Sequence, residues 1–134
     1  MTRAAALGCT VLLLSSTSAS AERDLVPTLD NQPDVCPDQP PEPEWMRNTE
    51  ARDAYKRLLV QQIHRFQSME RIVDAQSCAC ATRYPSWEAA EAVYFDRYST
   101  ADYWDVVEAT SDFRRQANEL RKQAMPICEA AGNW

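Results

Sequence analysis

Glycine is nearly absent from this chain, and its absence constrains the fold more strongly than any other feature of the sequence. The 134 residues include only Gly8 and Gly132. Tight β-hairpin turns need residues that adopt positive φ angles, chiefly glycine and asparagine. Asn118 is the one asparagine between residues 49 and 131. Loops that cradle phosphate groups also depend on glycine. We therefore expect an all-α fold without a nucleotide-binding loop.

Residues 1–21 have the layout of a cleavable secretory signal peptide. Arg3 provides a basic start, residues 4–14 form an apolar run, and residues 19–21 are the small residues of a cleavage site. The apolar run is far shorter than the roughly 20 residues that a membrane-spanning helix needs, which makes a retained anchor the weaker interpretation. Cleavage after residue 21 removes Cys9 and leaves a mature protein that begins at Glu22. We expect this protein in the periplasm or outside the cell.

The mature chain is long enough for one modest domain, and it is acidic. Loss of Arg3 leaves 13 of the 14 basic residues against 20 acidic residues, which gives a net charge of −7. Such a surface repels nucleic acid. No later segment has the composition of a membrane-spanning or basic amphipathic helix. We therefore expect neither a nucleic-acid partner nor stable membrane insertion after signal cleavage.

Proline is concentrated in residues 22–47, which contain six of the eight prolines of the chain. Because proline fixes φ and lacks a backbone N–H, we predict an extended N-terminal arm here. The arm is either a disordered spacer or a segment strapped onto the body of the protein by Cys36. We favour the strapped arm, since a cysteine in an exported protein usually has a partner.

Residues 48–134 have the apolar spacing of amphipathic helices and form the predicted helical domain. The predicted helices cover about 49–77, 87–98 and 101–125, and a short C-terminal turn covers 126–131. Ser86 is expected to cap the second helix, and Ser99 with Asp102 the third. The apolar stripes of the first and third helices are expected to pack together. Two folds fit this pattern: an antiparallel helical hairpin, in which the second and third helices run back along the first, or a small three-helix bundle.

Four cysteines remain in the mature chain and are the strongest candidate constellation. They are Cys36, Cys78, Cys80 and Cys128. An even count in an exported chain predicts two disulfides, and four cysteines allow three pairings. In one arrangement Cys36 pairs with Cys128. Cys78 and Cys80 then lie at the tip of the helical hairpin, where its helices turn, and form a strained disulfide ring or a reactive dithiol. In the other, each tip cysteine has a separate partner. We favour the second arrangement because it avoids a strained ring.

Aromatic residues form a second concentration, with seven of the twelve between residues 84 and 104. Trp87, Tyr94 and Tyr98 share one helical face, and Phe95 lies beside it. The favoured interpretation is that this face covers the hydrophobic core. The alternative is a partner-binding surface made by Trp87, Tyr94, Tyr98 and Trp104, because aromatic side chains often anchor interfaces.

The sequence contains no recognisable catalytic motif. His64 is the only histidine, and without a second histidine at ligand spacing it is interpreted as a boundary residue. We predict no catalytic residues, no cofactor and no metal site, and therefore no enzyme. The predicted function is that of a small exported interaction protein, an accessory subunit or inhibitor that binds an unidentified protein in the bacterial envelope. The alternative is a periplasmic thiol-redox or soft-metal-handling protein that uses Cys78 and Cys80.

Overall fold

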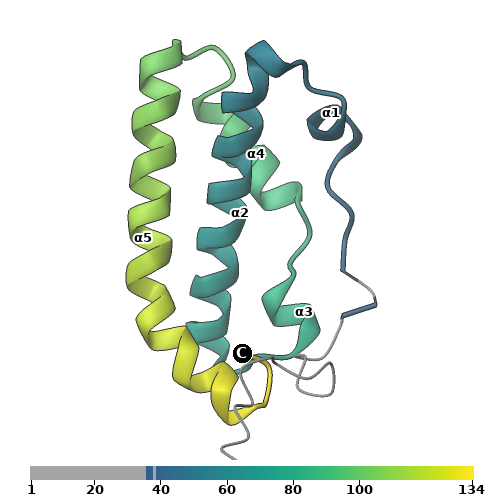
Figure 1. The fold of residues 1–134 in the computed structure, drawn as a ribbon, viewed down its shortest axis with the longest axis vertical. Coiled ribbons are helices and arrows are strands. Elements are labelled where there is room, and N and C mark those ends of the chain that lie inside the picture. Colours follow the sequence, from purple (N-terminus) through teal and green to yellow (C-terminus); the bar gives the residue numbers. More distant parts are fainter. Residues whose placement is uncertain (1–35, 38) are drawn as a thin grey trace, which may run out of the picture.

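The computed structural model describes residues 36, 37 and 39–134 (Figure 1). The predicted signal peptide and the first part of the predicted arm, residues 22–35, lie outside the described residues. Within the described part, the chain forms helices and no strand, so the all-α prediction is confirmed. The elements in chain order are α1 (Glu44–Arg47), the 3-10 helix η2 (Ala51–Asp53), α2 (Ala54–Ala75), α3 (Cys80–Arg83), α4 (Glu88–Arg97) and α5 (Tyr103–Ala130).

The N-terminal arm was predicted to stay extended as far as residue 47, and this boundary is wrong. Residues 39–43 have no helical structure, but α1 follows them directly. Its Met46 side chain is completely buried in the core, and the indole of Trp45 donates a hydrogen bond to the Glu91 carboxylate at 2.7 Å. Burial of an apolar side chain and one long-range hydrogen bond therefore stabilise a single helical turn after the last proline of the arm.

The helix α2 carries the apolar stripe of the first predicted helix on its buried side. Leu59, Val60, Ile63 and Ile72 are almost fully buried. The helix ends at Gln76, which adopts a left-handed conformation with φ of 47°. This conformation lets the N–H of Ser77 bond back to the carbonyl of Ile72 at 3.3 Å, which satisfies a carbonyl at the helix end.

The caps of the two later helices differ from the prediction. Trp87, rather than Ser86, is the N-cap residue of α4, and it makes no side-chain capping bond. At α5 the cap is Asp102, and Ser99 takes no part. The Asp102 carboxylate accepts hydrogen bonds from the N–H groups of Trp104 at 2.8 Å and Asp105 at 3.1 Å. An acidic N-cap is favourable because it also faces the positive end of the helix dipole.

The separate C-terminal turn predicted at 126–131 is also wrong, because α5 continues through Pro126 to Ala130. Proline removes one backbone donor from the helix, and the last turns of α5 curve toward the base of α2 (Figure 1). Cys128, two residues after the proline, is joined to Cys78. This bond holds the last turn against the rest of the molecule. Gly132, with φ of 70°, follows the helix end.

The helices α2 and α5 lie side by side and run in the same direction (Figure 1). Three contacts show this direction: Tyr55 with Tyr103, Phe66 with Phe113 and Cys78 with Cys128. The predicted packing of the first and third helices is therefore confirmed, but the antiparallel hairpin is wrong. The segment containing α3 and α4 returns along α2, and residues 98–102 then reverse the chain again. The chain therefore runs the length of the molecule three times, along α2, back through α3 and α4, and again along α5, with its direction reversed each time.

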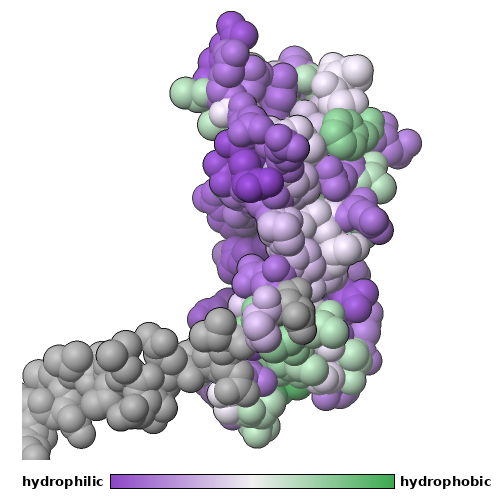
Figure 2. Space-filling view, turned by 90° about the vertical axis from the view of Figure 1, so that its right-hand side faces the viewer, coloured by the Kyte–Doolittle hydropathy of each residue, from purple (hydrophilic) through white to green (hydrophobic). Residues whose placement is uncertain are grey.

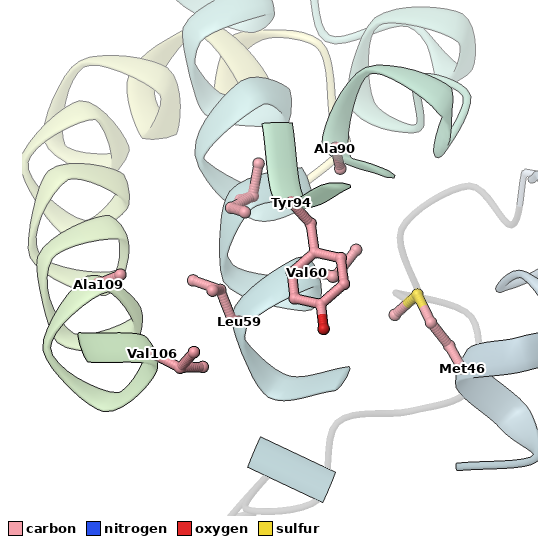
Figure 3. Close-up of a cluster of buried hydrophobic side chains, with 8 residues drawn as sticks. Met46, Leu59, Val60, Ala90, Tyr94, Val106 and Ala109 are labelled. Atoms are coloured by element: carbon pink, nitrogen blue, oxygen red, sulfur yellow. The ribbon is translucent and has the colours of Figure 1, made fainter. Parts of the chain in front are cut away.

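Two apolar clusters form the core. The larger lies between α1, α2, α4 and the first half of α5, and Figure 3 shows its side chains converging from these four helices. The smaller contains Ile72, Cys78, Ala124 and Cys128 and lies at the end of the molecule where α2 and α5 finish. Within the described part of the chain, no helix is both long and apolar enough to cross a membrane.

Candidate functional site

The two disulfides give each cysteine of the 78–80 tip its own partner. Cys36 is bonded to Cys80 and Cys78 to Cys128, with Cα atoms 5.5 Å and 5.0 Å apart. This is the favoured of the two predicted arrangements. Cys128 reaches the tip because α5 runs parallel to α2, so the pairing of Cys36 with Cys128 is wrong. Because Cys78 and Cys80 are each bonded to another cysteine, they do not form the pair of neighbouring thiols that a function of the dithiol requires. Structural disulfides indicate an oxidising, non-cytoplasmic environment.

The described residues of the arm, 36, 37 and 39–43, are called the strap below. In addition to its disulfide, the strap accepts hydrogen bonds from Trp87 and from two side chains of α2. The carbonyl of Pro40 accepts a bond from the Trp87 indole at 3.2 Å. The Glu42 carboxylate accepts bonds from Arg57 at 2.5 Å and from Gln61 at 2.6 Å. Burial raises the pKa of Glu42, but these bonds and the charge of Arg57 outweigh it and lower the pKa overall.

Arg83, at the end of α3, joins the strap to the C-terminus. Its Nη2 lies 2.9 Å from Sγ of Cys36 and 3.8 Å from Sγ of Cys80. Its Nη1 donates to the carbonyl of Asn133 at 3.0 Å. The side chain of Asn133 in turn donates to the carbonyl of Cys78 at 3.2 Å. A positive charge therefore lies against one disulfide and within the network that closes this end of the molecule.

His64 is half-buried, which agrees with the boundary position expected for it. Its ring stacks on Trp87 with the centroids 3.9 Å apart, and Nε2 lies 2.9 Å from the carbonyl of Pro85, to which it donates. Burial lowers the pKa of His64, and the bond to Pro85 opposes this shift only in part. The ring is thus kept neutral as a packing residue. Among residues 36–37 and 39–134, no group of histidine, cysteine and acidic side chains is arranged to hold a metal ion.

The aromatic residues predicted as partner-binding do not share an exposed face. Tyr94 is only 4% exposed, and Trp87 and Tyr98 pack against the larger core cluster. Their common face is turned inward and covers the core, which is the favoured interpretation of the pattern. Trp104, the fourth residue of the set, is 74% exposed. Phe95 follows Tyr94 in α4 and is 54% exposed, because neighbouring residues of a helix point in different directions.

Three exposed aromatic side chains and two half-buried ones gather instead at the end of the molecule where the chain reverses between α4 and α5. This region, called the aromatic end below, consists of Trp45, Tyr55, Phe95, Tyr103 and Trp104. Phe95 lies against Trp45 with ring centroids 5.5 Å apart. Tyr103 joins Tyr55 at 4.9 Å and Trp104 at 5.0 Å. Tyr103 is the first residue of α5 and is 49% exposed, because the buried side of this helix begins at Val106.

A shallow cavity of about 390 Å³ lies on the Trp45 and Phe95 side of the aromatic end. Trp45 and Phe95 line it together with Asp53 and Lys56. The ammonium of Lys56 lies 2.8 Å from the Asp53 carboxylate and 5.6 Å from the centre of the Tyr55 ring. The hydrogen bond from Lys56 lowers the pKa of Asp53. Aromatic surface and a fixed ion pair therefore adjoin at this end.

A larger groove of about 760 Å³ lies between the strap, α2 and the segment from α3 to the start of α4. Its lining includes Gln39, Gln67, Cys80, Tyr84 and Ser86. The Gln67 side-chain oxygen is buried and has no hydrogen-bond partner among the described residues. Figure 2 shows the face that carries the strap and α3. Hydrophobic residues gather at its lower end, and most of the remaining face is hydrophilic.

Comparison with protein-family models, with curated proteins and with solved structures found no match to this chain.

Proposed function

We propose that this protein is an exported helical binding protein of the bacterial envelope, which acts on a protein partner as an accessory subunit or inhibitor. The partner contacts the aromatic end. One observation carries the proposal: Phe95, Tyr103 and Trp104 are each about half or more exposed at one end of the molecule, and Tyr103 and Trp104 lie against each other. The other exposed large hydrophobic residues of the described part, Leu58 and Trp134, are less exposed, at 38% and 42%. Single exposed apolar residues are common, whereas a contiguous group of large ones is typical of an interaction surface.

The composition of the aromatic end suits a protein interface. Tryptophan and tyrosine dominate the binding energy of many interfaces, because each buries a large rigid surface and keeps a polar group for hydrogen bonding. Asp53 and Lys56 border the rings, and such a polar border is typical of the rim of an interface. The two charges pair with each other, so the surface has no strong net charge that would direct it to a nucleic acid or an anionic membrane.

Location is the second part of the proposal, and it rests on the predicted signal peptide together with the disulfides. An oxidising compartment preserves the bonds from Cys36 and Cys128. The periplasm or the cell exterior is such a compartment, and the sequence predicts export to it.

Site-specific photocrosslinking in the producing bacterium tests the proposed interface. A photoreactive phenylalanine analogue replaces Trp104 or Phe95, and a control variant carries it at Glu129, which is exposed at the opposite end of α5. We expect one adduct of the same mass from positions 104 and 95, in the exported fraction, and none from position 129. The absence of an adduct from both aromatic positions, or an equal yield from position 129, would contradict the proposal.

A further inference from the structure

The two disulfides lie in different environments. Cys78 is 2% exposed and Cys128 is fully buried, and both belong to the smaller apolar cluster. Cys80 is only half-buried and lines the groove of about 760 Å³. An attacking thiolate must reach a sulfur atom from outside, so accessibility controls the rate of disulfide exchange. The Cys36–Cys80 bond is therefore open to attack from the groove, whereas the Cys78–Cys128 bond is protected by the core.

Arg83 adds an electrostatic difference between the two bonds. Exchange is faster when the departing sulfur is a better-stabilised thiolate, and a neighbouring arginine stabilises a thiolate. Nη2 of Arg83 is closer to Sγ of Cys36, at 2.9 Å, than to Sγ of Cys80, at 3.8 Å. Attack on Cys80 from the groove thus releases Cys36 as a thiolate beside the guanidinium. Exposure and charge favour the same direction of reaction.

We propose that the Cys36–Cys80 disulfide is a thiol–disulfide exchange site that a dithiol reductant opens from the groove, with Arg83 as the group that stabilises the departing Cys36 thiolate. This inference is independent of the proposed function, because it concerns the opposite end of the molecule from the aromatic end. It uses Cys80 with Cys36, and Cys78 has only a structural part in it.

The exchange takes two steps. A thiolate of the reductant attacks Sγ of Cys80, a mixed disulfide forms, and the electron pair of the Cys36–Cys80 bond leaves on Sγ of Cys36. The second thiolate of the reductant then attacks the reductant's first sulfur, which is bonded to Sγ of Cys80 in the mixed disulfide. The bond to Cys80 breaks, and Cys80 leaves as a thiolate. The reductant becomes a cyclic or intramolecular disulfide. The protein gains two electrons, and its two thiolates take protons from water according to their pKa values.

Reduction removes the covalent attachment of the strap but leaves its hydrogen bonds. Pro40 still accepts from Trp87, and Glu42 still accepts from Arg57 and Gln61. Gln39 of the strap lines the groove. The reduced state is therefore a folded protein in which the groove is bounded by a strap without its covalent anchor.

The rate of reduction at each disulfide tests the proposal. The oxidised full-length mature protein is treated with dithiothreitol, quenched with an alkylating agent at intervals, and analysed by peptide mass spectrometry. We expect Cys36 and Cys80 to be alkylated at least about tenfold faster than Cys78 and Cys128. Equal rates at the two bonds, or earlier reduction of Cys78–Cys128, would overturn the proposal.

Variants of Arg83 separate the chemical role from a structural one. Arg83→Gln removes the charge and should slow reduction of Cys36–Cys80 about fivefold to tenfold, while Arg83→Lys should retain much of the rate. Loss of a merely structural contact would loosen the strap and speed reduction instead. Arg114→Gln, on the exposed side of α5, is the matched control and should leave the rate unchanged. An unchanged or faster rate in Arg83→Gln would show that Arg83 does not assist the exchange.

Discussion

Replacement of Trp87 by alanine should destabilise the protein strongly, although Trp87 is not fully buried. Its ring stacks on His64 and packs against the larger core cluster, and its indole N–H binds Pro40 of the strap. Truncation of a fully buried aromatic side chain costs about 3–5 kcal/mol. Because Trp87 is half-buried, we expect a loss of about 2–3 kcal/mol in the free energy of unfolding, of which roughly 1 kcal/mol is the hydrogen bond.

Urea denaturation followed by far-ultraviolet circular dichroism measures this loss. Trp87→Phe retains most of the ring but not the donor, and it should cost about 1 kcal/mol. Trp104→Ala is the matched control on an exposed tryptophan and should change the free energy of unfolding by less than about 0.5 kcal/mol. If Trp87→Ala and Trp104→Ala unfold at the same urea concentration, the assignment of one ring to the core and the other to the surface is refuted.

Three further predictions concern the helix ends and His64. Gln76→Gly should raise the free energy of unfolding by about 0.5–1 kcal/mol, since glycine adopts the left-handed conformation at this position without strain; an unchanged urea midpoint would speak against this. Asp102→Ala should lower the free energy of unfolding by about 1 kcal/mol through loss of the cap of α5, and Asp102→Asn should restore most of it. The pKa of His64 is lower in the folded protein than its ordinary value of 6.5, so the unfolded chain takes up a proton at a higher pH than the folded protein does. The stability that neutral His64 provides is therefore complete above pH 6.5 and is lost as the pH falls below this value. Denaturation curves of His64→Gln should show a weaker loss over this range, and an identical loss in both proteins would contradict the assignment.

The helical class could be predicted from sequence because it depends on local features. Scarcity of glycine disfavours tight turns, and the spacing from Leu59 to Ile72 marks the buried side of α2 wherever its partner lies. The inward direction of Tyr94 followed from the same periodicity. These properties do not depend on how distant parts of the chain meet.

The direction of α5 and the location of the exposed aromatic residues could not be predicted in this way. The apolar seam of α5 fits a parallel or an antiparallel neighbour equally well, and the choice depends on the short return made by α3 and α4. Trp45 illustrates the same limit. It lies just after the prolines of the arm, and its place beside Phe95 arises from the burial of Met46, a contact between distant segments.

The pairing of the cysteines is the claim on which the strap, the direction of α5 and the exchange site all depend. Peptide mapping of the unreduced protein, with a protease that cleaves after Ala79 so that Cys78 and Cys80 separate, measures it directly. We expect two linked species, one joining Cys36 to Cys80 and one joining Cys78 to Cys128. A species that joins Cys36 to Cys128, or free thiols at positions 78 and 80 in the oxidised protein, would contradict this pairing.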